Sequence, residues 1–192
     1  MLKIDKGSNI KAGFTLVEIA IVMVIIGLLI GGVLKGQAMI QNAKVKRVVK
    51  QAEELRAAIL SFYDKYGVYP GDENKAALPP GADWEGDGDG QIEKNRERFE
   101  VYLDLQLADL IRGSYNGTSD LPVHAFGGNV EMYWVDPGPG TAKHCFLFYN
   151  LPAEACLEID AKYDDSAYDA GSISASEAYT AGTTIATFYI IF

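Results

Sequence analysis

Residues 13–34 read GFTLVEIAIVMVIIGLLIGGVL, and this stretch decides how the rest of the chain is organised. After its first glycine, the run is apolar or small except for Thr15 and Glu18. A helix that crosses a bilayer needs roughly 20 such residues at about 1.5 Å each, so the sequence predicts a membrane-spanning helix here. A carboxylate inside such a span costs about 2–3 kcal/mol unless a partner compensates it, which makes Glu18 a candidate functional residue.

The residues ahead of the span distinguish it from an ordinary secretory signal. The leader MLKIDKGSNIKAG carries three lysines against one aspartate. A secretory signal peptide has its small-residue cleavage site after the apolar core, whereas here the small residues Ala12 and Gly13 come before it. A cut at this place would remove the basic leader and keep the apolar run as the new N-terminus.

The run from Lys11 to Glu18, KAGFTLVE, resembles the class III signal of type IV pilins and type II secretion pseudopilins. The resemblance is specific over residues 11–66 and only general beyond them. It implies that a prepilin peptidase cuts between Gly13 and Phe14 and N-methylates Phe14, so that residues 1–13 are a leader peptide. An uncleaved signal anchor with one stray acid is the alternative.

By this resemblance, the chain is a structural subunit of a type IV pilus or a type II secretion pseudopilus. Its partners would be identical or related pilin subunits in a helical filament, the prepilin peptidase, an inner-membrane assembly platform and, before assembly, membrane lipid. The head would face the periplasm on a single-pass bacterial inner-membrane helix. Two alternatives stay open: a minor or tip pilin for adhesion or DNA uptake, and a membrane-tethered binding or enzymatic domain that does not polymerise.

The resemblance also implies an assembly role for Glu18. Its carboxylate would pair with the freed α-amino group of Phe14 in a neighbouring subunit, because a buried ion without its partner is strongly unfavourable. The alternative within one chain is a contact with its own terminus, one helical turn away.

A helical repeat continues beyond the apolar span. Apolar residues recur at alternating intervals of three and four, at Val45, Val48, Ala52, Leu55, Ile59, Phe62 and Tyr66. That spacing places them on one face of a helix, and no proline interrupts the chain between residues 14 and 69. We therefore expect one helix over residues 14–66, with 14–34 in the membrane or filament core.

Four glycines lie near the end of the span, at Gly27, Gly31, Gly32 and Gly36. Glycine costs about 1 kcal/mol in a helix interior relative to alanine. Two interpretations are open: a segment that extends when subunits pack into a filament, and close helix–helix approach through small residues.

Residues 67–192 predict a head of α+β class. The expected helices are Glu97–Arg112 and Pro152–Tyr163, and the expected strands are Asn129–Val135, Lys143–Leu151 and Thr184–Ile191. The strand candidates are rich in aromatic and β-branched residues, and residues 164–182 are expected to be loop. The predicted fold is pilin-like: a long N-terminal helix packed on a small antiparallel sheet.

Within the long acidic loop 67–95, the stretch 85–93 reads EGDGDGQIE. Set against the calcium-loop pattern D-x-[DN]-x-[DN]-G-x5-E, it fits at Asp87 and Asp89 and departs at Glu85 and at Arg96. Alternating carboxylates on a glycine-rich loop suit Ca²⁺. The candidate ligands are Asp87, Asp89, Glu85 and Glu93, with Asp83, Glu93 and Glu97 as substitutes for the missing last acid. A solvated acidic turn is the alternative.

The cysteines, the net charge and the absence of enzyme motifs bear on which classes of function are expected. Cys145 and Cys156, an even count in an exported chain, predict one disulfide, with two buried free thiols as the alternative. The formal net charge of −9 argues against direct nucleic-acid binding. With two histidines and no G-x-S-x-G, P-loop or H-E-x-x-H pattern, the sequence does not predict an enzyme.

Overall fold

The computed structural model describes residues 13–75, 78–81, 84–137 and 142–192. Of the leader predicted over residues 1–13, only Gly13 is among the described residues, and Asp83 of the acidic loop also lies outside them. The chain divides into two compact units, Met1–Asn42 and Ala43–Phe192.

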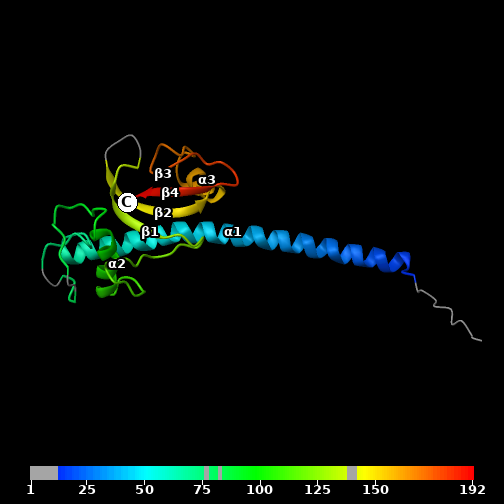
Figure 1. The fold of residues 1–192 in the computed structure, drawn as a ribbon, viewed down its shortest axis with the longest axis horizontal. Coiled ribbons are helices and arrows are strands. Elements are labelled where there is room, and N and C mark those ends of the chain that lie inside the picture. Colours follow the sequence, from blue (N-terminus) through cyan, green and yellow to red (C-terminus); the bar gives the residue numbers. More distant parts are fainter. Residues whose placement is uncertain (1–12, 76–77, 82–83, 138–141) are drawn as a thin grey trace, which may run out of the picture. The chain divides into compact units, whose positions relative to one another are not determined.

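Helix α1, Leu16–Tyr66, runs for 51 residues and confirms the continuous helix predicted from the sequence (Figure 1). In the first unit its apolar side chains face solvent, with Leu16 91% and Leu28 73% exposed. The helix is long and apolar enough to cross a membrane, with a mean hydropathy of 2.8 over its most apolar window. The four glycines stay helical, so both interpretations of them stay predictions.

In the second unit, α1 buries one face. The buried positions are Val45, Val48, Ala52, Leu55, Ala58, Ile59 and Phe62. They are the predicted apolar stripe with Ala58 added and Tyr66 only half-buried. Burying each large side chain contributes about 1.5–3 kcal/mol. The helix ends as expected at Gly67: its N–H still donates to the Tyr63 carbonyl at 2.7 Å, and its positive φ of 76° then turns the chain out of the helix.

The head of the second unit is built on a four-stranded antiparallel sheet. Its strands are β1 (Val130–Val135), β2 (Lys143–Pro152), β3 (Ile173–Ala175) and β4 (Thr184–Ile191), in the order β1-β2-β4-β3 (Figure 1). Three strands confirm the predictions to within one residue. The residues of β3 were expected to be loop. They form a strand of three residues that pairs with β4, and a strand this short has no recognisable pattern in the sequence.

Two short helices complete the head, α2 (Glu97–Leu107) and α3 (Ala153–Tyr163). The prediction that α2 continues to Arg112 is wrong. Asp109 takes a left-handed conformation with φ 59°, and the N–H groups of Asp109 and Leu110 bond back to the carbonyls of Gln106 and Leu105. This double hydrogen bond closes the helix end before Gly113 is reached.

The predicted disulfide is not formed: Cys145 and Cys156 are both buried free cysteines. Cys145 lies near the start of β2, and Cys156 lies in the first turn of α3, which follows the end of β2. The seven intervening strand residues span about 23 Å, of which the first turn of a helix recovers only about 6 Å. A disulfide needs Cα atoms within about 7 Å, so the strand keeps the two thiols apart.

Candidate functional site

The N-terminal motif begins at an exposed junction. Gly13 and Phe14 precede α1 in a non-helical conformation, and the Phe14 side chain is 84% exposed. A Cβ atom added to Gly13 would meet no atom within 4 Å. The peptide bond predicted to be cleaved therefore lies on an open segment immediately before the helix.

Thr15 and Glu18 cap the start of α1 reciprocally. The Glu18 carboxylate accepts hydrogen bonds from the Thr15 N–H and the Thr15 hydroxyl, both at 2.8 Å. In return, the Thr15 hydroxyl oxygen accepts the Glu18 N–H at 3.2 Å. This is a capping box, which satisfies two of the unpaired N–H groups of a helix start.

Glu18 therefore has a partner within its own chain, and that partner is Thr15, through its N–H and its hydroxyl, rather than the chain terminus. Thr15 was not predicted as the partner of Glu18, although a threonine followed three residues later by glutamate is the sequence signature of a capping box. The expected intersubunit partner, the α-amino group of Phe14, exists only after cleavage and is not tested by the uncut chain.

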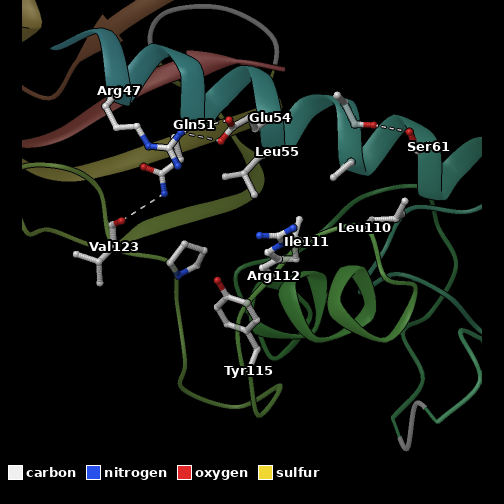
Figure 2. A pocket seen from close by; sticks show the side chains of 13 residues that line it. Arg47, Gln51, Glu54, Leu55, Ser61, Leu110, Ile111, Arg112, Tyr115 and Val123 are labelled. Carbon is white, nitrogen blue, oxygen red and sulfur yellow. Dashed lines mark hydrogen bonds and ion pairs between the residues drawn. The ribbon is translucent and has the colours of Figure 1, made fainter. Parts of the chain in front are cut away.

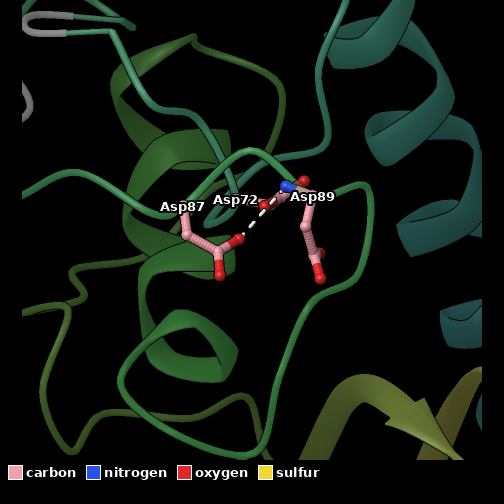
Figure 3. Close-up of side chains that lie close together, drawn as sticks. All are labelled: Asp72, Asp87 and Asp89. Atoms are coloured by element: carbon pink, nitrogen blue, oxygen red, sulfur yellow. Dashed lines mark hydrogen bonds between the residues drawn. The ribbon is translucent and has the colours of Figure 1, made fainter.

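The acidic loop brings together carboxylates that are distant in sequence. Asp72, Asp87 and Asp89 place one carboxylate oxygen each within 4.8 Å of one another (Figure 3). Asp72 is fixed by the N–H groups of Gly88 and Gly90, both at 2.9 Å. Both glycines have positive φ, 74° and 89°, which glycine adopts without strain and which lets the backbone wrap around the Asp72 carboxylate.

A second group shares Asp87 with the first and adds Glu93 and Glu97. Of the predicted ligands, Asp87 therefore lies with Asp89 in one group and with Glu93 in the other, while Glu85 belongs to neither group. Asp72 was missed because it lies well ahead of the acidic stretch 85–93 in the sequence, and only the fold of the loop brings the two together.

Burial sets the charge state of this region. It raises the pKa of Asp72 to about 6 and that of Glu97 to about 7, against the hydrogen bonds that lower both values. Oxygen-only donors of this kind are the ligands that hard cations such as Ca²⁺ take. Calcium at Asp87, Asp89, Glu85 and Glu93 stays a prediction.

Both histidines serve as packing groups. The His144 ring accepts the Ile92 N–H on Nε2 at 3.0 Å and packs edge-on against Trp134 and Tyr69. Burial lowers its pKa to about 4. The His124 ring lies between the Tyr149 carbonyl and the Phe126 N–H. The His144 bond to Ile92 ties the acidic loop to the sheet.

A groove of about 780 Å³ lies between α1 and residues 110–123 (Figure 2). On the helix side, Arg47 forms a salt bridge with Glu54 at 3.0 Å, and Gln51 donates a hydrogen bond to the Val123 carbonyl at 3.4 Å. Arg112 and Tyr115 line the opposite side. The groove combines apolar walls with charged and aromatic groups, which suits ligand contact.

Comparison with known proteins gives one finding. Residues 8–34 match the prokaryotic N-terminal methylation motif. No curated protein and no solved structure matches the chain. The match covers the predicted cleavage junction, the capping box and the apolar span.

Proposed function

We propose that this chain, which carries the N-terminal methylation motif that marks type IV pilins and pseudopilins, is a structural subunit of a type IV pilus or a type II secretion pseudopilus. The motif indicates a substrate of prepilin peptidase. It also makes other pilin subunits the expected kind of partner, and it favours a structural role over a catalytic one.

One observation carries the proposal: the motif lies on an open junction directly ahead of an exposed apolar helix. Gly13 and Phe14 are exposed, and the helix that follows is long and apolar enough for a membrane. Such a surface is unfavourable in water, so it needs lipid before assembly and other helices afterwards. Cleavage of the leader would supply the second half of an ion pair, the Phe14 amino group.

In this proposal, Glu18 changes partners. Before cleavage its carboxylate caps its own helix through Thr15. In the filament it pairs with the Phe14 amino group of a neighbour, since a charge in a low-dielectric core requires a compensating charge. A subunit that enters out of register leaves Glu18 unpaired, which makes the pair a device for alignment.

The test separates the capping role from the charge. Glutamine can complete a capping box as glutamate does, but it carries no charge. We expect Glu18→Gln to insert into the membrane and to be cleaved normally, while its incorporation into sheared filaments falls at least tenfold. Immunoblots of membrane and filament fractions measure both quantities.

Thr15→Ala is the matched control, because it removes both hydrogen bonds of the Thr15 hydroxyl from the cap and keeps the Glu18 charge. It is expected to retain filament incorporation with a slightly frayed helix start. If Glu18→Gln is incorporated like the wild type, Glu18 serves only as a cap and the proposed ion pair is wrong.

The second candidate function is a minor or tip pilin, and the groove of Figure 2 favours it because its charged and aromatic lining suits a ligand. The two candidates differ in subunit abundance. A major subunit accounts for most of the protein in purified filaments, whereas a tip subunit is present in few copies, as quantitative mass spectrometry would show.

A further inference from the structure

The groove between α1 and residues 110–123 is basic, although the chain as a whole is acidic. Arg47, Glu54 and Arg112 line it (Figure 2). Arg47 and the neighbouring Lys50 both pair with Glu54, at 3.0 and 3.4 Å, so one carboxylate is shared by two cations. Within the described part of the chain, Arg112 forms no ion pair. Three cations and one carboxylate give the groove a formal charge of +2, in a chain whose formal net charge is −9.

The groove also has the kinds of side chain that protein interfaces use. Leu55 forms part of its wall from α1, and Leu110, Ile111 and Tyr115 line it from the opposite side, each half-buried. Tyrosine and arginine are enriched where proteins contact one another, and they often contribute most of the binding energy there. The groove therefore suits a segment of another protein that carries negative charge.

The acidic stretch 85–93 carries the opposite charge without compensation. Its four acids are Glu85, Asp87, Asp89 and Glu93, and all four are exposed. None of them forms an ion pair with a lysine or arginine among the residues that the structure describes. No residue of this stretch lines the groove of its own chain. One head therefore presents two separate surfaces of opposite charge.

Hydrogen bonds within the head hold the acidic stretch in its place. The Asp72 carboxylate accepts two of its backbone N–H groups, and the Ile92 N–H donates to the His144 ring at 3.0 Å. The loop that carries Asp72 is itself tied to α2, because Asp104 accepts the Gly71 N–H at 2.6 Å. The exposed carboxylates are therefore held outside the groove of their own chain, and a protein partner for them must come from another molecule.

A second copy of the chain offers a partner for both surfaces. Patches of opposite charge attract each other and fix the orientation in which two proteins meet. Because the groove and the acidic stretch are different surfaces, each copy would give its groove to one neighbour and its acidic stretch to another. Such a head-to-tail contact can continue from copy to copy into a helical filament. A symmetric pair that joined two grooves would instead bring like charges together.

We propose that the groove between α1 and residues 110–123 binds the acidic stretch 85–93 of a second copy of this chain. Arg112 supplies the guanidinium that no carboxylate of its own chain occupies. The proposal rests on the filament role proposed above and adds to it a contact between heads. Exposed charge pairs contribute more to specificity and orientation than to affinity. The apolar helices therefore supply most of the association, and the groove sets the register of one head against the next.

The first experiment reverses charges in the full chain and measures the fraction of membrane-bound subunit that enters sheared filaments, by immunoblot. Arg112→Glu is expected to lower this fraction at least fivefold, and so is Glu85→Lys combined with Glu93→Lys. These two acids are chosen because neither carboxylate accepts a backbone N–H among the described residues.

The variant that combines all three substitutions has the opposite charges on both surfaces. It is expected to recover at least half of the wild-type incorporation, because each contact again joins unlike charges. Lys162→Glu is the matched control: it changes the net charge as Arg112→Glu does, at an exposed position of α3 outside the groove. Its incorporation is expected to equal that of the wild type.

The second experiment crosslinks the proposed contact. Cys145 and Cys156 are buried, so cysteines added at the surface are expected to be the ones that react. A chain with both Arg112→Cys and Glu85→Cys should give a ladder of disulfide-linked oligomers in mildly oxidised filaments, because each copy is linked to two neighbours. Each single variant should stay monomeric, and a mixture of the two single variants should give dimers and nothing larger.

Three results would overturn the groove contact and leave the filament role intact. One is wild-type incorporation of Arg112→Glu. Another is a loss in Arg112→Glu that the triple variant does not restore, which would assign the groove to a different occupant, such as a ligand of a tip subunit. The third is a dimer formed by Arg112→Cys alone, which would mean that two grooves face each other.

A different result separates the filament role from the groove contact. A wild-type chain that never enters filaments would overturn the filament role and the groove contact with it. If Arg112→Glu does not accumulate in the membrane, Arg112→Gln takes its place, because it removes the cation without adding a negative charge. It is then expected to lower incorporation at least twofold, and incorporation at the wild-type level would overturn the contact.

Discussion

At the scale of single residues, Thr15 and Glu18 form a capping box in the structure, and the proposed function gives Glu18 a second partner in the filament. In the capping box, the Glu18 carboxylate accepts two hydrogen bonds from Thr15. Before cleavage, the carboxylate at the start of the apolar helix therefore already has hydrogen-bond donors. The Glu18 carboxylate can pair with a neighbouring subunit only if the new partner binds it more strongly than the N–H and hydroxyl of Thr15 do. An ionised amino group is such a partner, because it donates a charge-assisted hydrogen bond.

The buried acids make the stability of the head depend on pH. Burial raises the pKa of Glu97 from 4.5 to about 7. A group whose pKa is higher in the folded state contributes stability that is present below its unfolded pKa and is lost as pH rises through its folded pKa. In metal-free buffer, ionising Glu97 therefore costs roughly 3 kcal/mol between about pH 4.5 and pH 8.

A variant separates the contribution of Glu97 from that of His144. Because the pKa of His144 is lowered, its contribution makes the free energy of unfolding increase with pH below about pH 6.5, opposite to that of Glu97. The Glu97→Gln variant can still accept the Glu93 N–H but cannot ionise. We expect its free energy of unfolding, relative to wild type, to rise by up to roughly 3 kcal/mol from pH 5 to pH 8. Urea titrations at several pH values measure it. A difference that is independent of pH would contradict the raised pKa.

Which residues gather at a buried site is the part that sequence reasoning reaches least well. Asp87 and Asp89 stand out because their repeat is local. Asp72 and Asp104 join the region only because glycines let the loop turn and approach α2, as at Gly71 and Gly88. Such contacts depend on tertiary structure, and no sequence pattern around Asp104 predicts them.

At the scale of elements, periodicity explains what could be predicted. The alternating three- and four-residue spacing of α1 is set by helix geometry, so its stripe and its end at Gly67 follow from the sequence. The end of α2 could not be predicted in this way. The helix ends where Asp109 adopts a left-handed conformation, and this conformation is expected from the sequence mainly at glycine, not at aspartate. β3 is too short to show alternation and exists only through its pairing with β4.

The stripe makes a testable distinction between neighbouring positions on α1. Ile59 is fully buried, whereas Leu60 is 50% exposed. We expect Ile59→Ala to lower the free energy of unfolding by about 2–5 kcal/mol, through lost burial and a cavity.

Leu60→Ala is the matched control and should change stability by less than about 0.5 kcal/mol. Chemical unfolding of the full chain in detergent, followed by tryptophan fluorescence, compares the two variants. Equal losses would mean that the stripe does not face the core.

At the scale of the whole molecule, the predicted cleavage after Gly13 would change both the length and the charge of the chain. The leader holds three lysines and one aspartate, a net charge of +2, so its removal takes the formal net charge from −9 to −11. Charge of this sign outside the membrane favours solubility and disfavours nonspecific contact with nucleic acid.

Mass spectrometry of the chain extracted from membranes tests this directly. We expect the intact mass to correspond to a chain that starts at Phe14 and carries one added methyl group. Replacing Gly13 with a bulky residue, Gly13→Val, should leave the full-length mass and the basic leader in place. A wild-type chain recovered at its full unprocessed mass would contradict the assignment of the cleavage junction.

The sheet order also has a consequence for the sequence of folding events. β4 is the last strand of the chain, yet it lies between β2 and β3 and pairs with both. During synthesis or export, β2 and β3 therefore have no shared neighbour until residues 184–191 arrive. Until then the edge of β2 that pairs with β4 has no strand partner. A nonsense mutation that removes only β4 would leave the β1–β2 hairpin alone and β3 without a strand to pair with, rather than a slightly smaller sheet.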